Sequence, residues 1–204
     1  MKKIISIFLV AILYSCGSSV SPVDQGLIDQ VMHIGNGSEP QGLDPHIVTG
    51  VPEHHLLITM CEGLTISNPE GGANLPGMAE SWEISEDGKT YIFNIRKDAK
   101  WSNGDDFVAD DMVWSWMRVL TPSLGSQYPD MLYYVVGAED FNTGVITDFS
   151  EVGVKALDKK TLEVKLNNPT PFFLGLLSHY STWPVHKETV LEFGEIDDRQ
   201  GLWT

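Results

Sequence analysis

The chain has 204 residues, with 28 Asp and Glu against 13 Lys and Arg, which gives a formal net charge of −15 at pH 7. A chain this acidic does not seek nucleic acid or anionic lipid, so we expect neither as a partner. Hydrophobic residues make up 42% of the chain and aromatic residues 10%, which favours a packed globule of one or two domains over a disordered acidic tail.

Residues 1–15 predict a secretory signal peptide. Lys2 and Lys3 precede a largely apolar run that ends at Leu13. This run is too short for a permanent membrane helix, which needs roughly 18 to 20 apolar residues. We therefore expect the mature protein to be exported and soluble.

Cys16 ends the stretch LYSC, which resembles the lipobox of bacterial lipoproteins. The resemblance implies cleavage before Cys16 and a diacylglyceryl group on its sulfur, and the alternative is an ordinary cysteine near a cleavage site. Cys61 is the only other cysteine, so acylation of Cys16 would exclude an intramolecular disulfide. We expect Cys61 to be a small buried hydrophobe.

The next segments predict a tether, a strand and a helix. Residues 16–27 contain GSSVSPVDQG, whose small and polar composition suits a flexible tether. The stretch VMHIG, residues 31–35, predicts a short strand. We expect a helix over residues 52–63, PEHHLLITMCEG, because Pro52 suits the first turn, where its missing amide costs nothing.

Alternating apolar and polar residues predict two hairpins. The first spans residues 81–97, with Asp87-Gly88 at its turn, and the second spans residues 153–166.

Helical periodicity appears between and after the hairpins. Residues 108–120 carry an apolar stripe, with acidic residues near the amino end and Arg118 near the carboxyl end, as the helix dipole favours. Residues 169–194 predict two short helices split by Trp183-Pro184. Hairpins mixed with helices indicate an α/β or α+β globule.

The stretch LDPHIVTGVPEHH, residues 43–55, contains three histidines that invite a metal hypothesis. His54 and His55 are neighbours in the predicted helix, so their side chains point about 100° apart and cannot both face one ion unaided. We expect capping or solvated histidines, and a metal-dependent function centred on His54 and His55 stays as a weaker hypothesis.

Motifs of enzymes are incomplete in this sequence. DGKT at residues 87–90 lacks the first glycine of a phosphate-binding loop and lies in a hairpin turn. DDFVADD at residues 105–111 lacks the spacing and the glycine of a calcium loop, so helix capping explains its carboxylates. No GxSxG elbow is present. We expect neither an enzyme nor a bound cofactor or metal.

Aromatic residues are frequent in the middle of the chain, and we expect most of them in the core: Trp101, Trp114, Trp116, Tyr128, Tyr133 and Tyr134. Tyr128 is the exception, because it lies in the turn-rich GSQYPD with no helical face to bury it.

Four segments, in order, carry a family resemblance: GSEPQGLDPHIVTGVPE, CEGLTISNPEG, PGMAESWEISEDGKTYIFNIRKDAKWSNGDDFVADDMVWSWMR and GVKALDKKTLEVKLNNPTPFF. From about residue 29 to the last residue, the chain resembles the amino-terminal part of the oligopeptide-binding proteins of ABC importers, solute-binding protein family 5. The resemblance implies an α/β fold, a truncated two-lobed clamp of the class II periplasmic binding proteins. Residues 28–62 and 167–204 would form part of lobe I, and residues 63–166 would form a small inserted lobe II.

In this family the peptide lies in the cleft as an added strand. The resemblance implies that Thr49, Gly50 and Val51 match the edge segment that pairs with the ligand, and that Tyr128 matches a cleft tyrosine. Pro52 biases Val51 toward an extended conformation, and Gly50 allows another backbone to approach closely.

Two departures from the family affect ligand binding. Many members have an acidic residue where this chain has Thr49. Members are also more than twice as long, and the second large lobe is missing here. Micromolar affinity needs about 8 kcal/mol, whereas two or three backbone hydrogen bonds contribute roughly 1 kcal/mol each. We therefore expect an incomplete fragment with weak or no binding.

The resemblance implies the extracytoplasmic solute-binding component of an ABC importer, in the periplasm or at the cell surface. Its implied partners are an oligopeptide, the membrane subunits of an ABC permease, and lipid through Cys16. Dipeptides, nickel chelates and oligosaccharides stay open as ligands. A surface lipoprotein that acts through protein contacts without transport also stays open.

Overall fold

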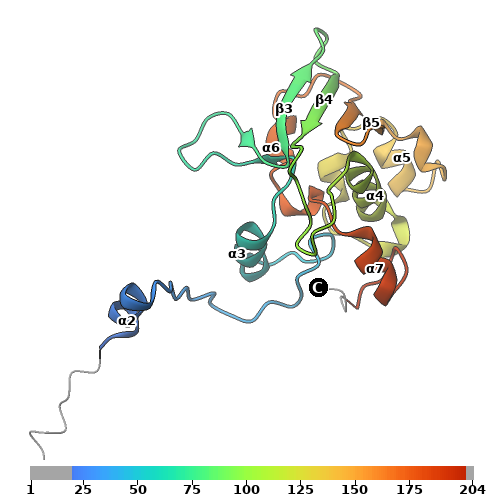
Figure 1. The fold of residues 1–204 in the computed structure, drawn as a ribbon. Helices are drawn as coiled ribbons and strands as arrows, with labels where there is room; N and C mark the ends of the chain where they lie inside the picture. Colours follow the sequence, from blue (N-terminus) through green and yellow to red (C-terminus); the bar gives the residue numbers. More distant parts are fainter. Residues whose placement is uncertain (1–19, 201–204) are drawn as a thin grey trace, which may run out of the picture. The chain divides into compact units, whose positions relative to one another are not determined.

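The computed structural model describes residues 20–200. The signal peptide predicted at residues 1–15 and the lipidation predicted at Cys16 lie outside the described residues. The chain divides into two compact units, residues 1–37 and residues 38–204, and each is described by itself (Figure 1). The helices within residues 20–200 are all too short or too polar to cross a membrane.

The described part of the first unit contains the helix α2 (Pro22–Asp29). This helix corrects the expectation of a flexible tether that continues to residue 27. Ser21 caps it: the Asp24 amide donates to Ser21 Oγ over 3.1 Å, and the Ser21 hydroxyl donates to the Asp24 carboxylate over 2.7 Å. Pro22 starts the first turn, where no amide is needed. Capping therefore outweighs the small, polar composition that suggested a coil.

The strand predicted at residues 31–35 is wrong, because this stretch has no regular structure. Its apolar residues suggested burial, yet Met32 and Ile34 are 83% and 70% exposed. A strand needs a neighbour for its amides and carbonyls, and none of the strands within residues 20–200 pairs with this stretch.

The second unit is built on a four-stranded antiparallel sheet with strand order β3-β4-β6-β5. The first hairpin joins β3 (Ala79–Ile84) to β4 (Thr90–Ile95), and the second joins β5 (Val154–Asp158) to β6 (Thr161–Lys165). Gly88 has a φ of 67° at the first turn, a conformation that glycine adopts without strain. Both predicted hairpins are confirmed.

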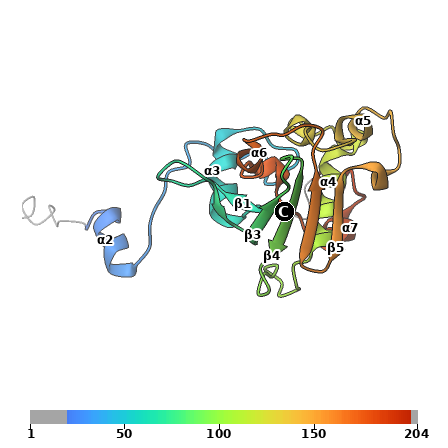
Figure 2. The same cartoon turned by 90° about the horizontal axis from the view of Figure 1, so that it is seen from above.

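The helix α4 (Ala109–Leu120) packs against this sheet and completes the main core (Figure 2). The buried side chains of the two central strands alternate with half-buried ones, as the sequence predicts: Tyr91, Phe93, Ile95, Leu162 and Val164 face the core. From α4, Met112, Trp116 and Leu120 are at most 1% exposed. The predicted apolar stripe of this helix is therefore confirmed.

The other elements are short. They are α3 (Val51–Met60), β1 (Thr65–Ile66), β2 (Leu75–Pro76), α5 (Ala138–Asn142), α6 (Phe173–Leu176), α7 (Lys187–Phe193) and the 3-10 turns η1 (Pro122–Leu124), η2 (Pro129–Leu132), η3 (Phe149–Glu151) and η4 (Tyr180–Thr182). β1 and β2 pair as a separate two-stranded sheet. The two short helices predicted on either side of Trp183-Pro184 are present as α6 and α7.

The helix predicted over residues 52–63 exists, but it ends three residues early, at Met60. Cys61 already has an extended backbone, and its amide donates to the Leu57 carbonyl as the last contact of the helix. Beyond it Gly63 passes close to Trp183: a Cβ on Gly63 would lie 2.3 Å from the indole ring. The close approach of Gly63 to Trp183 therefore requires glycine at residue 63.

The expected burial of Cys61 needs correction. Cys61 is exposed instead of buried. The helix ends just before it, and the backbone of Cys61 is extended. Among the aromatic residues, Trp114 and Trp116 are buried as expected, whereas Tyr134 is 38% exposed. Tyr134 lies in a turn and packs edge-on against Phe172, itself 56% exposed, so this aromatic pair stays at the surface.

Candidate functional site

The candidate segment Thr49–Gly50–Val51 leads into the helix α3. Thr49 is exposed, Gly50 is half-buried, and Val51 is 66% exposed. Gly50 has an extended backbone (φ −86°, ψ 159°) and caps the helix, and its carbonyl accepts the His54 amide over 3.0 Å. Val51 is the first helical residue, so the expectation that Pro52 would make Val51 extended is wrong. The bias before proline is a preference, and the helical hydrogen bonds outweigh it.

Several main-chain groups of this segment have no partner within residues 20–200. The hydrogen bonds of the described chain use neither the amide nor the carbonyl of Thr49, nor the amide of Gly50. The Val51 amide lies in the first turn of α3, where amides lack an intrahelical acceptor. No described strand pairs with the segment. It therefore offers an exposed set of donors and an acceptor to a ligand.

Buried contacts hold the segment in place on both sides. Glu53 is 4% exposed, and its Oε1 accepts the Gln41 amide over 2.6 Å. A Cβ on Gly50 would lie 1.8 Å from Glu53 Oε2, so the position of this carboxylate requires glycine at residue 50. Upstream, the Tyr180 hydroxyl donates to the Val48 carbonyl over 3.2 Å. The backbone is therefore fixed before any ligand arrives.

Tyr128 lies in the same neighbourhood. Its half-buried ring packs edge-on against His179, with ring centres 5.2 Å apart, and against Tyr180 at 6.3 Å. Tyr180 also contacts His54 across 5.7 Å between ring centres. The structure thus brings Tyr128 and the segment Thr49–Val51 together around Tyr180.

Sequence reasoning missed Tyr180 and His179. The available signal was their place in a turn-rich stretch, HYSTWP, the same argument that marked Tyr128. Burial is the main cause that raises the pKa of Tyr180 to about 12, with Tyr128 adding to it. Burial also lowers the pKa of His179, helped by the nearby His54. Both side chains are therefore neutral near pH 7.

The histidines of residues 43–55 do not gather around a common point. His46 is 1% exposed, and its Nε2 lies 2.9 Å from the Trp183 carbonyl. The rings of His54 and His55 are tilted by 53° with centres 6.2 Å apart. Within residues 20–200 no group of three or more His, Cys, Asp or Glu side chains is arranged to hold a metal ion.

His46 instead belongs to a buried network centred on Arg118. This arginine, near the carboxyl end of α4 as predicted, is fully buried and donates to both Asp44 oxygens over 3.0 and 2.7 Å. It also contacts His46 Nδ1 at 3.1 Å and donates to the Asp198 carbonyl over 3.0 Å. Burial, the largest effect, lowers the pKa of His46 to about 4, so the imidazole is neutral and accepts from Arg118. The network ties α4 to the segment that precedes Thr49.

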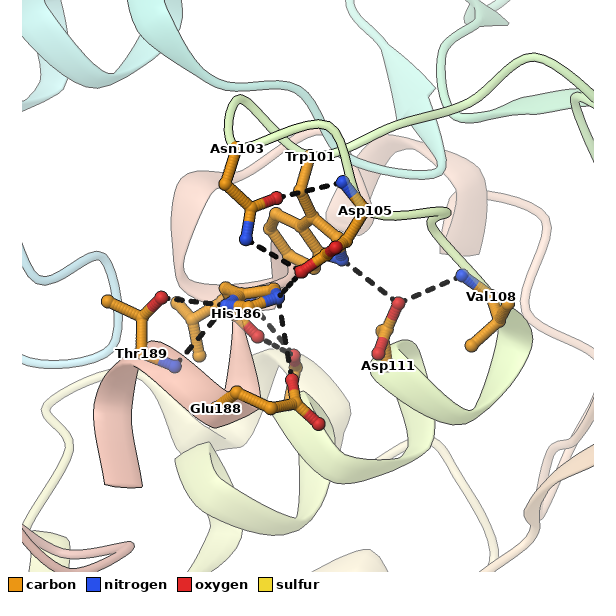
Figure 3. Close-up of polar contacts among 10 residues, drawn as sticks. Trp101, Asn103, Asp105, Val108, Asp111, His186, Glu188 and Thr189 are labelled. Atoms are coloured by element: carbon orange, nitrogen blue, oxygen red, sulfur yellow. Dashed lines mark hydrogen bonds and ion pairs between the residues drawn. The ribbon is translucent and has the colours of Figure 1, made fainter. Parts of the chain in front are cut away.

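A second polar cluster surrounds His186 at the start of α7 (Figure 3). The Thr189 amide donates to His186 Nδ1 over 3.2 Å, while Nε2 faces Asp105 Oδ2 at 3.3 Å and Glu188 Oε2 at 3.4 Å. The Trp101 ring packs edge-on against His186, with ring centres 5.1 Å apart.

The carboxylates of residues 105–111 have structural partners. Asp111 accepts the Val108 amide over 2.9 Å and the Trp101 indole N–H over 3.1 Å, as a capping residue of α4 does. Burial raises the pKa of Asp111. The capping function predicted for this acidic stretch is confirmed at Asp111.

Comparison with known proteins supplies the family. A sequence model of the bacterial extracellular solute-binding proteins, family 5 (middle region), matches residues 75–201. The chain is 44% identical over 168 residues to the periplasmic oligopeptide-binding protein OppA of Escherichia coli, covering 81% of this chain and 30% of that protein. It is 36% identical to the dipeptide-binding protein DppE of Bacillus subtilis, covering 78% of this chain and 29% of that protein.

A solved structure agrees with these sequence matches. The crystal structure of Haemophilus influenzae OppA in complex with the peptide RPPGFSPFR superposes with a TM-score of 0.74 and 39% identity, covering 82% of this chain and 33% of that one. The chain therefore spans about a third of the length of the relatives it matches. On this evidence it belongs to the bacterial extracellular solute-binding proteins of family 5.

Proposed function

We propose that this chain supplies one wall of the peptide site in an extracytoplasmic solute-binding component of an ABC importer. The ligand's main chain would pair with Thr49, Gly50 and Val51, and Tyr128 would border the same site. The observation that carries the proposal is that, within residues 20–200, the amide and carbonyl of the exposed Thr49 and the amide of Gly50 have no hydrogen-bond partner. Recognition through backbone groups leaves the ligand's side chains loosely specified, which suits oligopeptides.

We also propose a division of the chain into parts of two lobes. Residues 28–62 and 167–204 would contribute to lobe I, and residues 63–166 would form lobe II. Contacts between Val48 and Tyr180 and between His46 and Trp183 join the two lobe I segments. The proposed lobe II contains the four-stranded sheet and α4.

Binding by this wall alone should be weak. Three main-chain hydrogen bonds bring about 3 kcal/mol in total at roughly 1 kcal/mol each, whereas millimolar affinity already requires about 4 kcal/mol. The relatives are about three times longer, so we infer that tight binding needs polypeptide beyond this chain. We also propose export through residues 1–15 and lipidation at Cys16, which mass spectrometry of the protein isolated from membranes would test.

The main-chain proposal is testable by NMR. The isotope-labelled protein is titrated to millimolar concentration with a pool of tri- to pentapeptides, and we expect amide shifts centred on residues 49–51. Thr49→Pro removes one donor and should at least halve these shifts, while Thr49→Ala keeps the donor and should leave them unchanged. Unfolding curves of both variants check the fold. Shifts confined to other residues, or an unaltered response of Thr49→Pro, would contradict the proposal.

A dipeptide is the second candidate ligand, because one relative is a dipeptide-binding protein. The two candidates differ in how far the ligand extends along the wall. Alanine tripeptide and alanine dipeptide in the same titration separate the two candidates. If the site binds oligopeptides, the tripeptide should shift amides near Tyr128 that the dipeptide leaves unchanged. If the site binds dipeptides, the two ligands should shift the same amides.

A further inference from the structure

Four aromatic rings form a chain of contacts that starts on the helix α3. His54, in the first turn of α3, has its ring centre 5.7 Å from that of Tyr180. Tyr180 stacks on His179, with ring centres 4.3 Å apart and planes inclined by 30°. Tyr128 packs edge-on against His179 at 5.2 Å. We call these four side chains the aromatic row, and it connects α3 with η4 and η2.

The aromatic row is fixed at its centre and has free surface on its other rings. Tyr180 is 3% exposed. His179 Nδ1 accepts the Ser181 amide over 3.3 Å, which sets the orientation of the imidazole. The side chains of His54, His179 and Tyr128 are half-buried, so each of them keeps part of its surface in contact with solvent. These three rings are therefore accessible to a ligand.

Two hydrogen bonds connect the aromatic row with the segment proposed to pair with the ligand. The His54 amide donates to the Gly50 carbonyl over 3.0 Å. The Tyr180 hydroxyl donates to the Val48 carbonyl over 3.2 Å. The two carbonyls belong to the residues on either side of Thr49. A peptide whose main chain pairs with this segment is therefore held next to the row.

The charges near the aromatic row do not favour a charged side chain of the ligand. Burial, helped by His54, lowers the pKa of His179, so its imidazole is neutral near pH 7. The Glu53 carboxylate is 4% exposed and accepts the Gln41 amide. Asp130, whose charge acts on His179, is exposed, and an ion pair at such a position contributes little. Aromatic rings, in contrast, attract one another beyond the area that they bury.

We propose that the aromatic row is a subsite for an aromatic side chain of the ligand peptide, and that His54 determines this specificity. The inference rests on the proposed peptide site and adds the class of peptide: one that carries Trp, Tyr or Phe at the residue beside the row. The ring of that residue packs against the free surfaces of His54 and Tyr128. His54 has the larger effect because its own amide is bonded to Gly50, so its side chain keeps a fixed place relative to the ligand's main chain.

Three sets of tripeptides test the subsite. Each set places Trp, Leu or Lys at each of the three positions in turn, with Ala at the other two. Affinities are taken from the amide shifts of residues 49–51 in the isotope-labelled protein. At one of the three positions we expect the Trp peptide to bind about threefold to tenfold more tightly than the Leu peptide, because contact between aromatic rings adds to the burial of apolar area.

Variants of His54 locate the contact. His54→Leu removes the ring but keeps an apolar side chain, and it should reduce the ratio of the Trp and Leu affinities to below about twofold. His54→Phe restores a ring and should restore the preference, which a merely structural role of His54 does not predict. His55→Leu is the matched control at the neighbouring exposed position and should leave the ratio unchanged. Each ratio compares two ligands of the same variant, so a general loss of stability cancels.

Three results would overturn the subsite: equal affinities of the Trp and Leu peptides at all positions, tighter binding of a Lys peptide, or a ratio that His54→Leu leaves unchanged. Tighter binding of Lys would assign the neighbourhood to a cation that pairs with Asp130. The alanine tripeptide separates this proposal from the main-chain proposal. If it shifts residues 49–51 while Trp and Leu bind equally, only the subsite fails. If every peptide leaves these residues unshifted, both proposals fail.

Discussion

His46 should make the stability of the protein depend on pH. The folded protein holds the neutral imidazole, with a pKa of about 4 against an ordinary value of 6.5. Between these values the unfolded chain binds a proton that the folded protein does not, so stability is complete above pH 6.5 and falls as the pH drops to 4. The difference of about 2.5 pKa values corresponds to roughly 3 kcal/mol at 1.36 kcal/mol each.

Urea unfolding of the parent and of His46→Gln between pH 8 and pH 4 measures this effect. Glutamine keeps an acceptor for Arg118 and does not titrate, so the difference in unfolding free energy between the two proteins should shrink by about 3 kcal/mol as the pH falls. Carboxylates affect both proteins alike and cancel in the comparison. Parallel curves for the parent and His46→Gln would refute the assignment of a buried, neutral imidazole.

Two further substitutions test the contacts around the site. Arg118→Met should lower the unfolding free energy by about 3 to 5 kcal/mol in urea titrations, because it leaves the Asp44 carboxylate buried without its partner; a loss below about 1 kcal/mol would mean that water solvates this carboxylate. Tyr180→Phe removes the hydrogen bond to the Val48 carbonyl and should cost about 1 kcal/mol, while the control Tyr134→Phe, at an exposed ring, should cost nothing measurable; equal losses in the two variants would argue against this bond.

The elements predicted correctly are those whose signal is local. In the hairpin around Gly88, alternation and turn chemistry agree, and the partner strand is a few residues away. In α4 the apolar stripe, the acidic first turn and the cap at Asp111 agree as well. When several local signals favour the same structure, that structure forms in agreement with the tertiary contacts and can be predicted from sequence.

Other features of the structure could not be read from the sequence pattern. The burial of Arg118 depends on Asp44, 74 positions away, which comes beside it. Val51 is helical because Gly50 can cap α3, although the residue before a proline prefers extended geometry. Cys61 has the composition of a core residue, but the end of the helix leaves it exposed.

The candidate site was located by family resemblance and not by pattern. Nothing in the composition of TGVP indicates unpartnered amides, and Tyr180, which connects Tyr128 with this segment, carries no motif of its own. What sequence could supply was the turn-rich context of Tyr128 and the steric freedom of Gly50. The geometry that unites these residues appears only in the folded chain.

The contacts that fix the candidate segment have a consequence for the order of folding. The Tyr180 bond to Val48 spans 132 positions and the His46 contact with Trp183 spans 137. Closing loops of that length is slow compared with forming a hairpin. The two hairpins should therefore be protected from hydrogen exchange within the earliest phase of refolding. Residues 43–50 should stay accessible to proteases until Tyr180 and Trp183 pack against them. A nascent chain interrupted before residue 180 would present this segment unfolded.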